Sequence, residues 1–258
     1  TLTKSIFITG AGAGIGLETA RLFASKGWFV GAADRDPRAL ENLQAELGER
    51  VCSTHVVDVT DEKAVAEALS EFAELTGGTI DALHNNAGIL RVGPFESIDI
   101  QDHRAIVEIN VIGLMNVLYA AFPYLKGASG AVVVNMSSAS AAYGTPDFAS
   151  YSASKHAVRA MTEALDIEWQ AHGIRVCDLM PPFVNTAMVQ ANVGGSRLFD
   201  SLGVNLAPSE VAAEVWKQVA SPQLHRAVSG QFKILWPIAR SAPTAVTRAV
   251  MKKLRRSS

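Results

Sequence analysis

The stretch Thr9–Gly16 reads TGAGAGIG and lies between a short apolar run, Lys4–Thr9, and a helical pattern, Leu17–Lys26. The run before it is rich in β-branched residues and predicts a buried strand. A glycine-rich turn between a strand and a helix brings backbone N–H groups and the helix N-terminus to one place, where a pyrophosphate can bind. This stretch, called the glycine loop below, therefore predicts a dinucleotide site.

The glycines of the loop are spaced Gly10-x3-Gly14-x-Gly16. Glycine permits tight turns and lets the backbone approach a ligand without a Cβ clash. Ile15 and Leu17 stand where the more common G-x-G-x-x-G pattern has its third glycine, and no Lys-Ser/Thr pair follows, which excludes a P-loop. We expect Gly10, Gly14, Ile15 and Gly16 to contact the cofactor.

Strand-like and helix-like segments alternate along the rest of the chain. Further apolar, β-rich runs predict strands at Trp28–Ala33, Val51–Val57, Ile80–His84, Ala131–Met136, Ile174–Met180 and Phe232–Trp236. Helical spacing predicts helices at about 40–47, 61–75, 99–126, 151–172 and 208–220. Repeated βαβ units specify a doubly wound parallel sheet with helices on both faces, and no linker divides them. We therefore predict one α/β domain over residues 1–258.

Two segments depart from this alternation. Residues 182–208 are long, glycine-containing and weakly periodic, which is typical of a mobile lid over a site. Residues 238–258 are strongly basic, and the end of this segment predicts an amphipathic basic helix.

The composition is that of a globular protein, with 48% hydrophobic and 19% charged residues among 258. This balance excludes an intrinsically disordered chain. No window of 18 apolar residues lacks charges and no secretory signal is visible, so we expect a cytoplasmic protein without a transmembrane helix. Cys52 and Cys177 lie in apolar runs without metal-ligand spacing, so we expect reduced core residues and no metal site.

Charge is unevenly distributed along the chain. Residues 1–214 hold all 25 acidic residues and 14 of the 23 basic ones, a charge of −11, whereas residues 215–258 carry +9. The simpler interpretation is that the basic segment packs on the acidic body or on a neighbouring subunit. Contact with an anionic membrane surface is the alternative, and we expect no nucleic-acid partner.

Asp34 ends the second predicted strand, 18 residues after Gly16. A carboxylate there can accept hydrogen bonds from both ribose hydroxyls and would repel a 2′-phosphate, which favours NAD over NADP. A turn or helix-capping role for Asp34 is the structural alternative. Arg35 leaves a second possibility open, because its guanidinium could hold a 2′-phosphate or stack on adenine.

Tyr151 and Lys155 are one helical turn apart and share a face of a predicted helix. A free tyrosine titrates near about 10, and a nearby ammonium would lower that pKa. The pair therefore predicts a general acid/base for interconverting an alcohol and a ketone. Ser138 ends an apolar strand 13 residues earlier, where its hydroxyl could hold the substrate oxygen.

Over nearly its whole length the chain resembles the classical short-chain dehydrogenase/reductase family. The resemblance rests on TGAGAGIG at 9–16, Asp58 in VVDVT, NNAG at 85–88, Asn110 in INVIG, MSS at 136–138 and YSASK at 151–155. It implies a Rossmann-type sheet and an NAD(P)-dependent oxidoreductase. It assigns Tyr151 as the acid/base, Lys155 as the ribose ligand that lowers the tyrosine pKa, and Ser138 as the donor to the substrate oxygen. Asn110 would hold a water in a proton relay.

The resemblance also implies the rest of the cofactor site. Asp58 and Val59 would approach adenine, and the backbone of Asn86, Ala87 and Gly88 would line the adenosine ribose. Pro181, Val184 and Thr186 match positions that meet the nicotinamide. Here the chain departs from the family, because Pro181-Pro182 replaces the usual Pro-Gly. Relatives pair through the helices at about 99–126 and 151–172, which implies a homodimer or homotetramer.

The loops that line the substrate pocket in this family are mainly apolar here. They carry Leu90, Val92, Phe95, Ala141, Tyr143, Phe148, Phe183 and Met188, with Arg91 and Arg197 as basic residues. From these we expect Leu90, Tyr143, Phe148, Phe183 and Met188 to contact the substrate together with Ser138 and Tyr151. An apolar lining favours an uncharged secondary alcohol or ketone.

These observations lead to one main functional hypothesis and two alternatives. The main hypothesis is an NAD-dependent alcohol dehydrogenase acting on an apolar substrate. The first alternative is an NADPH-dependent carbonyl reductase that uses Arg35. The second, from another class, is a dinucleotide-sensing binding protein without turnover.

Overall fold

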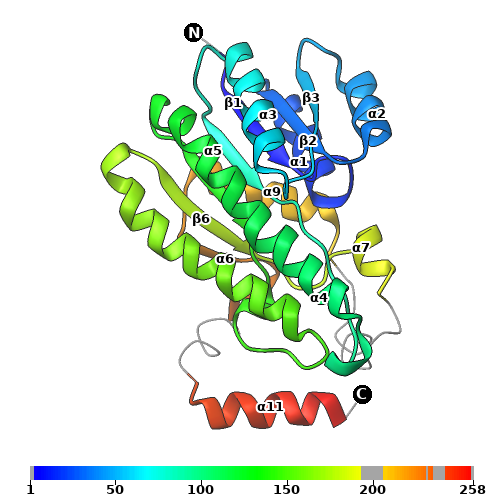
Figure 1. Cartoon of the computed structure of the whole chain (residues 1–258). Helices are drawn as coiled ribbons and strands as arrows, with labels where there is room; N and C mark the ends of the chain where they lie inside the picture. Colours follow the sequence, from blue (N-terminus) through cyan, green and yellow to red (C-terminus); the bar gives the residue numbers. More distant parts are fainter. Residues whose placement is uncertain (1–2, 193–205, 231, 235–241, 257–258) are drawn as a thin grey trace.

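The computed structural model describes residues 3–192, 206–230, 232–234 and 242–256. Its centre is a seven-stranded sheet in the order β3-β2-β1-β4-β5-β6-β7, in which every neighbouring pair is parallel (Figure 1). The strands are β1 (Ser5–Thr9), β2 (Phe29–Asp34), β3 (Cys52–Val56), β4 (Ala82–Asn85), β5 (Val132–Met136), β6 (Arg175–Met180) and β7 (His225–Ala227). The predicted doubly wound α/β fold is confirmed.

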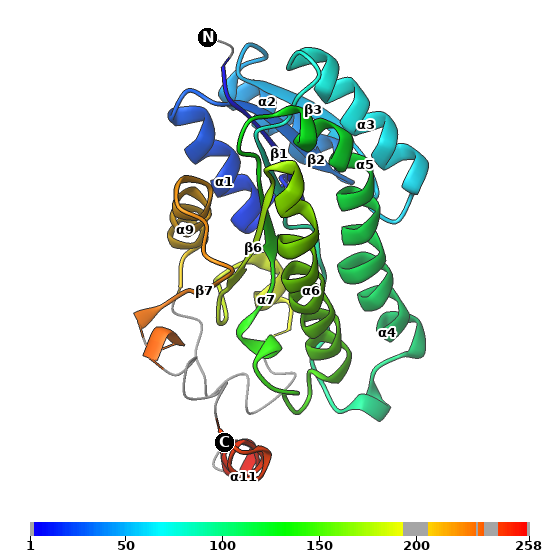
Figure 2. The same cartoon turned by 90° about the vertical axis from the view of Figure 1, so that its left-hand side faces the viewer.

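Helices cover both faces of the sheet (Figures 1 and 2). They are α1 (Gly14–Ser25), α2 (Pro37–Leu47), α3 (Glu62–Leu75), α4 (Ile100–Val107), α5 (Leu114–Gly127), α6 (Ala149–Glu168), α7 (Ala187–Gln190), α9 (Pro208–Ala220) and α11 (Thr244–Arg256). Short 3₁₀ turns lie at Phe95–Ser97, Ala139–Ala141 and Trp169–His172. Asp61 caps α3, because its carboxylate accepts hydrogen bonds from the Lys63 and Ala64 N–H groups.

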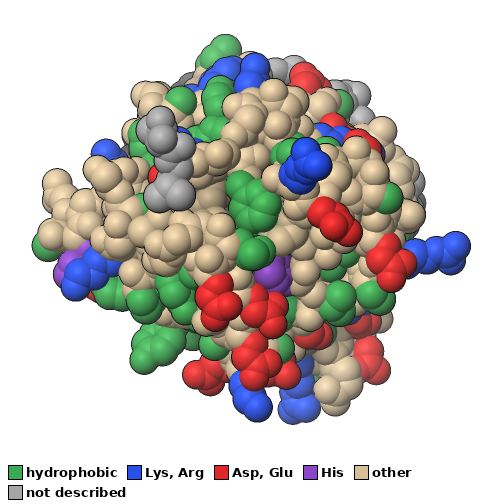
Figure 3. Space-filling model, turned by 90° about the horizontal axis from the view of Figure 1, so that it is seen from above, with side chains coloured by type: hydrophobic (Ala, Val, Ile, Leu, Met, Phe, Trp, Pro, Cys, Tyr) green, Lys and Arg blue, Asp and Glu red, His purple; other side chains and the backbone are tan. Residues whose placement is uncertain are grey.

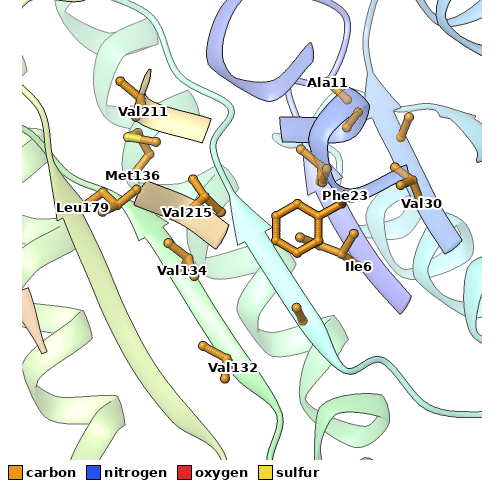
Figure 4. Packing of buried hydrophobic residues seen from close by; sticks show 14 of the residues in the cluster. Ile6, Ala11, Phe23, Val30, Val132, Val134, Met136, Leu179, Val211 and Val215 are labelled. Carbon is orange, nitrogen blue, oxygen red and sulfur yellow. The ribbon is translucent and has the colours of Figure 1, made fainter. Parts of the chain in front are cut away.

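Alternate residues of the central strands enter two separate cores. Ile6 and Ile8 of β1 face the core beneath α1, α2 and α9, where Phe23 and Val215 also pack (Figure 4). Phe7 of β1 faces the opposite core, beneath α3, α5 and α6. Because β1 and β5 are buried on both faces, they read as nearly continuous apolar runs, which is why the sequence predicts them well.

Two expectations need correction. The last strand lies at His225–Ala227 and not at 232–236; residues 232–234 are helical, and 235–236 lie outside the described residues. The helix expected at 99–126 is interrupted by a π-helical turn, Glu108–Gly113. By length and composition alone, Ile100–Gly127 could cross a membrane. However, α5 packs against α3 and β4, so this run includes a core helix of the domain.

Cys52 and Cys177 are both buried and free, as the sequence predicts. Burial raises the pKa of the Cys52 thiol to about 11, because the thiolate loses its hydration. At neutral pH this side chain is therefore a protonated core residue.

Candidate active site

The strand order reverses between β1 and β4, whose following loops run to opposite sides of the sheet. In open α/β sheets a ligand crevice forms at this point, beyond the carboxyl ends of the strands. Two adjoining cavities of about 130 and 230 Å³ lie there and share Gly10, Asp34, Ala87 and Gly88. The two cavities together are called the cleft below.

The backbone of the glycine loop has a conformation that residues other than glycine rarely adopt. Gly10 and Gly14 have φ angles of 67° and 54°, in the left-handed region that favours glycine. A Cβ on Gly16 would lie 2.1 Å from the Gly10 carbonyl oxygen, so Gly16 lies beneath the loop and supports it. The N-cap of α1, Ala13, makes no side-chain cap hydrogen bond, which leaves the first N–H groups of the helix without that acceptor. This cradle fits a pyrophosphate.

Asp34 and Arg35 line the smaller cavity beside Gly10. The Asp34 carboxylate accepts hydrogen bonds from the Gly12 N–H at 2.9 Å and the Asp36 N–H at 3.0 Å. It therefore braces the glycine loop and retains lone pairs that can accept further hydrogen bonds. The N-cap of α2 is Asp36 and not Asp34. A Cβ on Gly12 would lie 2.9 Å from the Asp34 carboxylate, a requirement for glycine that the sequence analysis missed.

Asp58 and Val59 line the same cavity. The Asp58 carboxylate accepts hydrogen bonds from the N–H and the hydroxyl of Thr60, so it also closes a turn. The Val59 carbonyl accepts a hydrogen bond from Asn116 of α5 at 3.0 Å. This wall is therefore held in place from the helix behind it.

The loop after β4 is tied to the glycine loop by Asn86 and Thr9. The Asn86 amide donates to the carbonyls of Thr9 and Gly10, and the Thr9 hydroxyl accepts hydrogen bonds from the N–H groups of Asn86 and Ala87. Asn86, Ala87 and Gly88 all line the cleft, as expected. Ile89, next in the chain, lines both cavities and was missed.

Asn110 lies behind the cleft, in the π-helical turn between α4 and α5. Its amide oxygen accepts a hydrogen bond from the Ile89 N–H at 2.8 Å, and its amide nitrogen donates to the Ile89 carbonyl and to Ser154. Asn110 thus joins the cleft wall to α6. Its role in holding a water stays a prediction.

Ser138, Tyr151 and Lys155 meet at one end of the larger cavity. Tyr151 and Lys155 lie on one face of α6, and Ser138 follows β5. Ser138 makes a side-chain hydrogen bond with Tyr151. The Lys155 ammonium is buried, donates to the Met136 carbonyl at 2.8 Å and lies 5.6 Å from the centre of the Tyr151 ring.

The structure corrects the expected effect of Lys155 on its neighbour. Burial raises the pKa of Tyr151, and the hydrogen bond from Ser138 opposes this rise only in part. Burial also lowers the pKa of Lys155 to about 8, because the ammonium loses its hydration. In the protein alone, desolvation of the phenolate therefore outweighs any stabilisation by the cation.

The segment after β6 forms the far wall of the cleft. The Pro181 carbonyl accepts a hydrogen bond from the Ala139 N–H at 2.9 Å, and Val184 pairs with Leu206. Thr186 caps α7, and its methyl group would lie 3.0 Å from a Cβ on Gly14. Pro181, Val184 and Thr186 all line the cleft, so the Pro-Pro sequence preserves this wall. Of the predicted lid at 182–208, residues 193–205 lie outside the described residues.

The wall beside Tyr151 is apolar, formed by Leu90, Phe183, Met188 and Val189. Val189 was missed, although it adjoins Met188 in the sequence. Two predicted contacts differ: Tyr143 and Phe148 do not line either cavity. The Phe148 ring is buried behind Phe183, with ring centres 5.5 Å apart.

The basic residues expected near the pocket add no free cation that the structure describes. Arg91 forms an ion pair with Asp102 at 2.9 Å and donates to the Leu90 carbonyl. Arg197 lies outside the described residues. Within the described ranges, no group of three His, Cys, Asp or Glu residues is placed to hold a metal ion.

Comparison with known proteins agrees with this arrangement. A family model described as short chain dehydrogenase matches residues 4–195. Galactitol 2-dehydrogenase (L-tagatose-forming) of Cereibacter sphaeroides is 36% identical over 214 residues, 80% of this chain and 84% of that protein. Sulfoacetaldehyde reductase 2 of Chromohalobacter salexigens is 35% identical over 199 residues, 76% of this chain and 79% of that protein.

A solved structure shows the same similarity. The crystal structure of 3-ketoacyl-(acyl-carrier-protein) reductase from Brucella melitensis, complexed with NADH, superposes with a TM-score of 0.78. It is 30% identical and covers 89% of this chain and 98% of that one. The chain belongs to the short-chain dehydrogenase/reductase family, whose members are oxidoreductases with a dinucleotide-binding Rossmann fold.

Proposed function

We propose that the chain is a dehydrogenase or ketone reductase that uses NAD(H) and acts on an apolar secondary alcohol or the corresponding ketone. The observation that carries this proposal is the meeting of Ser138, Tyr151 and Lys155 at the apolar end of the glycine-loop cleft. A bound nicotinamide dinucleotide would accept or donate the hydride. The residues of the chain would position the substrate and move the proton.

Ser138 and Tyr151 are hydrogen-bonded to each other, so both hydroxyls can meet one substrate oxygen. Tyr151 would take the hydroxyl proton during oxidation and return it during reduction. Because burial raises its pKa, Tyr151 is protonated at neutral pH and is ready to donate a proton. The protonated phenol is the form that donates a proton to a ketone oxygen during reduction.

The lining of the smaller cavity supports the proposed preference for NAD(H). Asp34 lies beside Gly10, where a ribose hydroxyl would meet an acceptor and a 2′-phosphate would meet a like charge. Arg35 lines the same cavity, which supports an NADPH-dependent carbonyl reductase as the second candidate. Comparing kcat/KM for NAD(H) and NADP(H) separates the two.

The apolar wall supports the proposed preference for an uncharged substrate. Leu90, Phe183, Met188 and Val189 present no charge to the cavity, and Arg91 is already paired with Asp102. Burying an apolar substrate against this wall is favourable, whereas a carboxylate would lose its hydration without a partner among these residues. A panel of apolar and carboxylated ketones, followed through nicotinamide absorbance, tests this preference.

Exposed apolar side chains on α5 and α6 support a homodimer or homotetramer. Tyr119 is 81% exposed and Ile167 is 76% exposed in the single chain. Burial of such side chains between subunits would remove them from water. Sedimentation analysis of the wild type and of Tyr119→Glu tests this arrangement. We place the protein in the cytoplasm, where its buried thiols stay reduced.

The decisive test of catalysis is Tyr151→Phe, which keeps the buried ring and removes the hydroxyl. We expect turnover to fall at least about a hundredfold while cofactor affinity changes little. Ser138→Ala should also lower turnover, because the hydroxyl beside Tyr151 is lost. Wild-type turnover in Tyr151→Phe would refute the mechanism. Cofactor binding without turnover of any substrate in the wild type would favour the dinucleotide-sensing alternative.

A further inference from the structure

Helix α11 lies apart from the sheet and its covering helices in both ribbon views (Figures 1 and 2). It lies beyond the end of the molecule toward which the parallel strands point, and the residues that line the cleft follow the carboxyl ends of those strands. A helix of 13 residues is about 20 Å long, enough to present a continuous face to a partner.

The two sides of α11 differ in character, and Lys253, seven residues after Val246, lies at the end of the side that carries the valines. Val246 and Val250 are one turn apart and are 50% and 48% exposed, so the described protein leaves half of each side chain in water. Arg248 and Lys252 are also one turn apart and lie across the helix from the two valines. In the sequence, Leu254 follows Val250 by four residues and continues the apolar side. Arg255 follows Arg248 by seven residues and continues the basic side.

The charge of this region has one sign. The helix contains five Lys or Arg residues and no acid, and no acid occurs anywhere in residues 215–258. The opposite end of the molecule, seen in Figure 3, shows acidic and basic side chains side by side. The complementary surface for α11 is therefore anionic, and it must accept a thin apolar face of alanine and valine.

An anionic lipid bilayer has both properties. An amphipathic basic helix lies in the membrane interface with its apolar face inward and its cations among the headgroups. A groove on a protein would normally receive large anchoring side chains, whereas the described apolar face of α11 offers valine and alanine. Weak apolar insertion with strong electrostatic attraction suits a diffuse lipid surface better.

We propose that α11 is a reversible anchor that binds an anionic bilayer surface and turns the mouth of the cleft toward it. Resting on the proposed function, this deepens the substrate assignment to apolar alcohols or ketones dissolved in the lipid. The apolar wall of Leu90, Phe183 and Met188 is carried by the segments that follow β4 and β6, and α11 lies beyond the end of the molecule toward which those strands point.

The test is sedimentation of the full chain with two kinds of vesicle, one of phosphatidylcholine alone and one that also contains phosphatidylglycerol. We expect binding to the second kind only, decreasing as salt is added. Arg248→Gln, Lys252→Gln and Lys253→Gln together should lower the partition coefficient about a hundredfold, at about fivefold per basic residue. Val246→Gln with Val250→Gln should also weaken binding.

A matched control removes the same charge elsewhere. Arg38, Arg50 and Lys63 are exposed and lie outside α11, so changing all three to Gln should leave binding within about twofold of wild type. Equal loss in both triple variants would show a net-charge effect and overturn the proposal. Equal binding to both vesicle types would also overturn it. A change of oligomeric state on removing the α11 charges would identify a second copy as the partner instead.

Turnover distinguishes failure of the anchor from failure of the site. With a water-soluble ketone, the α11 triple variant should match wild type; with a ketone dissolved in anionic vesicles, its KM should rise at least about tenfold. Membrane binding without any turnover would leave the anchor intact and refute the catalytic proposal. Normal turnover without membrane binding would refute the anchor and leave the catalytic proposal intact.

Discussion

The ammonium of Lys155 lies 5.6 Å from the centre of the Tyr151 ring, yet it donates its hydrogen bond to the carbonyl of Met136. The two side chains share one face of α6, and the carbonyl at the end of β5 decides where the cation lies. Desolvation is the largest cause of the pKa shift of both side chains. It raises the pKa of the phenol and lowers that of the ammonium.

The protonation of Lys155 should determine the pH above which kcat/KM for the cofactor falls. Because burial lowers its pKa to about 8, the ammonium is present below that pH and lost above it. The ratio kcat/KM for the cofactor reports groups of the free protein and should fall above about pH 8. Lys155→Arg keeps its charge at every pH in this range, so its profile should lack this decline. If the pH profile of Lys155→Arg showed the same decline as the wild type, the decline could not be assigned to the ammonium of Lys155.

The same lowered pKa gives a stability prediction. An unfolded chain keeps Lys155 protonated to about 10.4, so between pH 8 and that value the unfolded state binds more protons than the folded state. The free energy of unfolding should therefore rise with pH in this window, relative to Lys155→Met, where the titration is absent. Urea unfolding of both proteins at several pH values measures the difference. Parallel curves would argue against a buried ammonium.

Gly16 should tolerate no side chain. A Cβ there would meet the Gly10 carbonyl at 2.1 Å, and the glycine loop would have to move. We expect Gly16→Ala to lower the free energy of unfolding by about 1–3 kcal/mol and to abolish cofactor binding. Gly144→Ala is the matched control, because a Cβ at Gly144 meets nothing within 4 Å. Thermal unfolding and calorimetric titration with NAD measure both effects, and equal behaviour of the two variants would refute the account.

Asp34 should set the cofactor preference through its charge. Asp34→Asn keeps the shape and one acceptor oxygen, but it removes the repulsion of a 2′-phosphate. We expect the ratio of kcat/KM for NAD to that for NADP to fall at least about tenfold, which corresponds to about 1.4 kcal/mol. Asp36→Asn is the control, because Asp36 caps α2 and does not line the cleft. It should change stability without changing the ratio.

Asn192 should hold the cleft closed over the substrate. Its amide oxygen accepts a hydrogen bond from the Val92 N–H at 3.1 Å, and its amide nitrogen donates to the carbonyls of Met188 and Leu90. It therefore joins the end of α7 to the opposite wall. Loss of about 1 kcal/mol in Asn192→Ala should raise the substrate KM about fivefold, with the cofactor KM unchanged.

Gln190→Ala supplies the control for the Asn192 prediction. Gln190 bonds Asn185 within its own segment and does not cross the cleft in any described contact. Its substrate KM should stay near the wild-type value. An equal rise in both variants would mean that α7 was generally loosened and that no specific bridge was lost.

The sequence by itself determined the βαβ alternation and the position of the cofactor site. Strands buried on both faces are continuous apolar runs, and the glycine spacing at 10–16 is a local requirement of the backbone. The shared face of Tyr151 and Lys155 is also local, because it depends only on helical spacing. Such features depend on near neighbours in the chain and can be predicted from it.

Tertiary structure alone decided how the predicted side chains are used. Lys155 is directed to Met136, Phe148 is held behind Phe183, and Thr186 is placed against Gly14 by contacts between distant segments. The π-helical turn that carries Asn110 likewise joins the loop after β4 to α6. Desolvation and packing depend on what surrounds a group in space. No local pattern encodes these surroundings, and so the sign of the Tyr151 pKa shift appeared only in the folded chain.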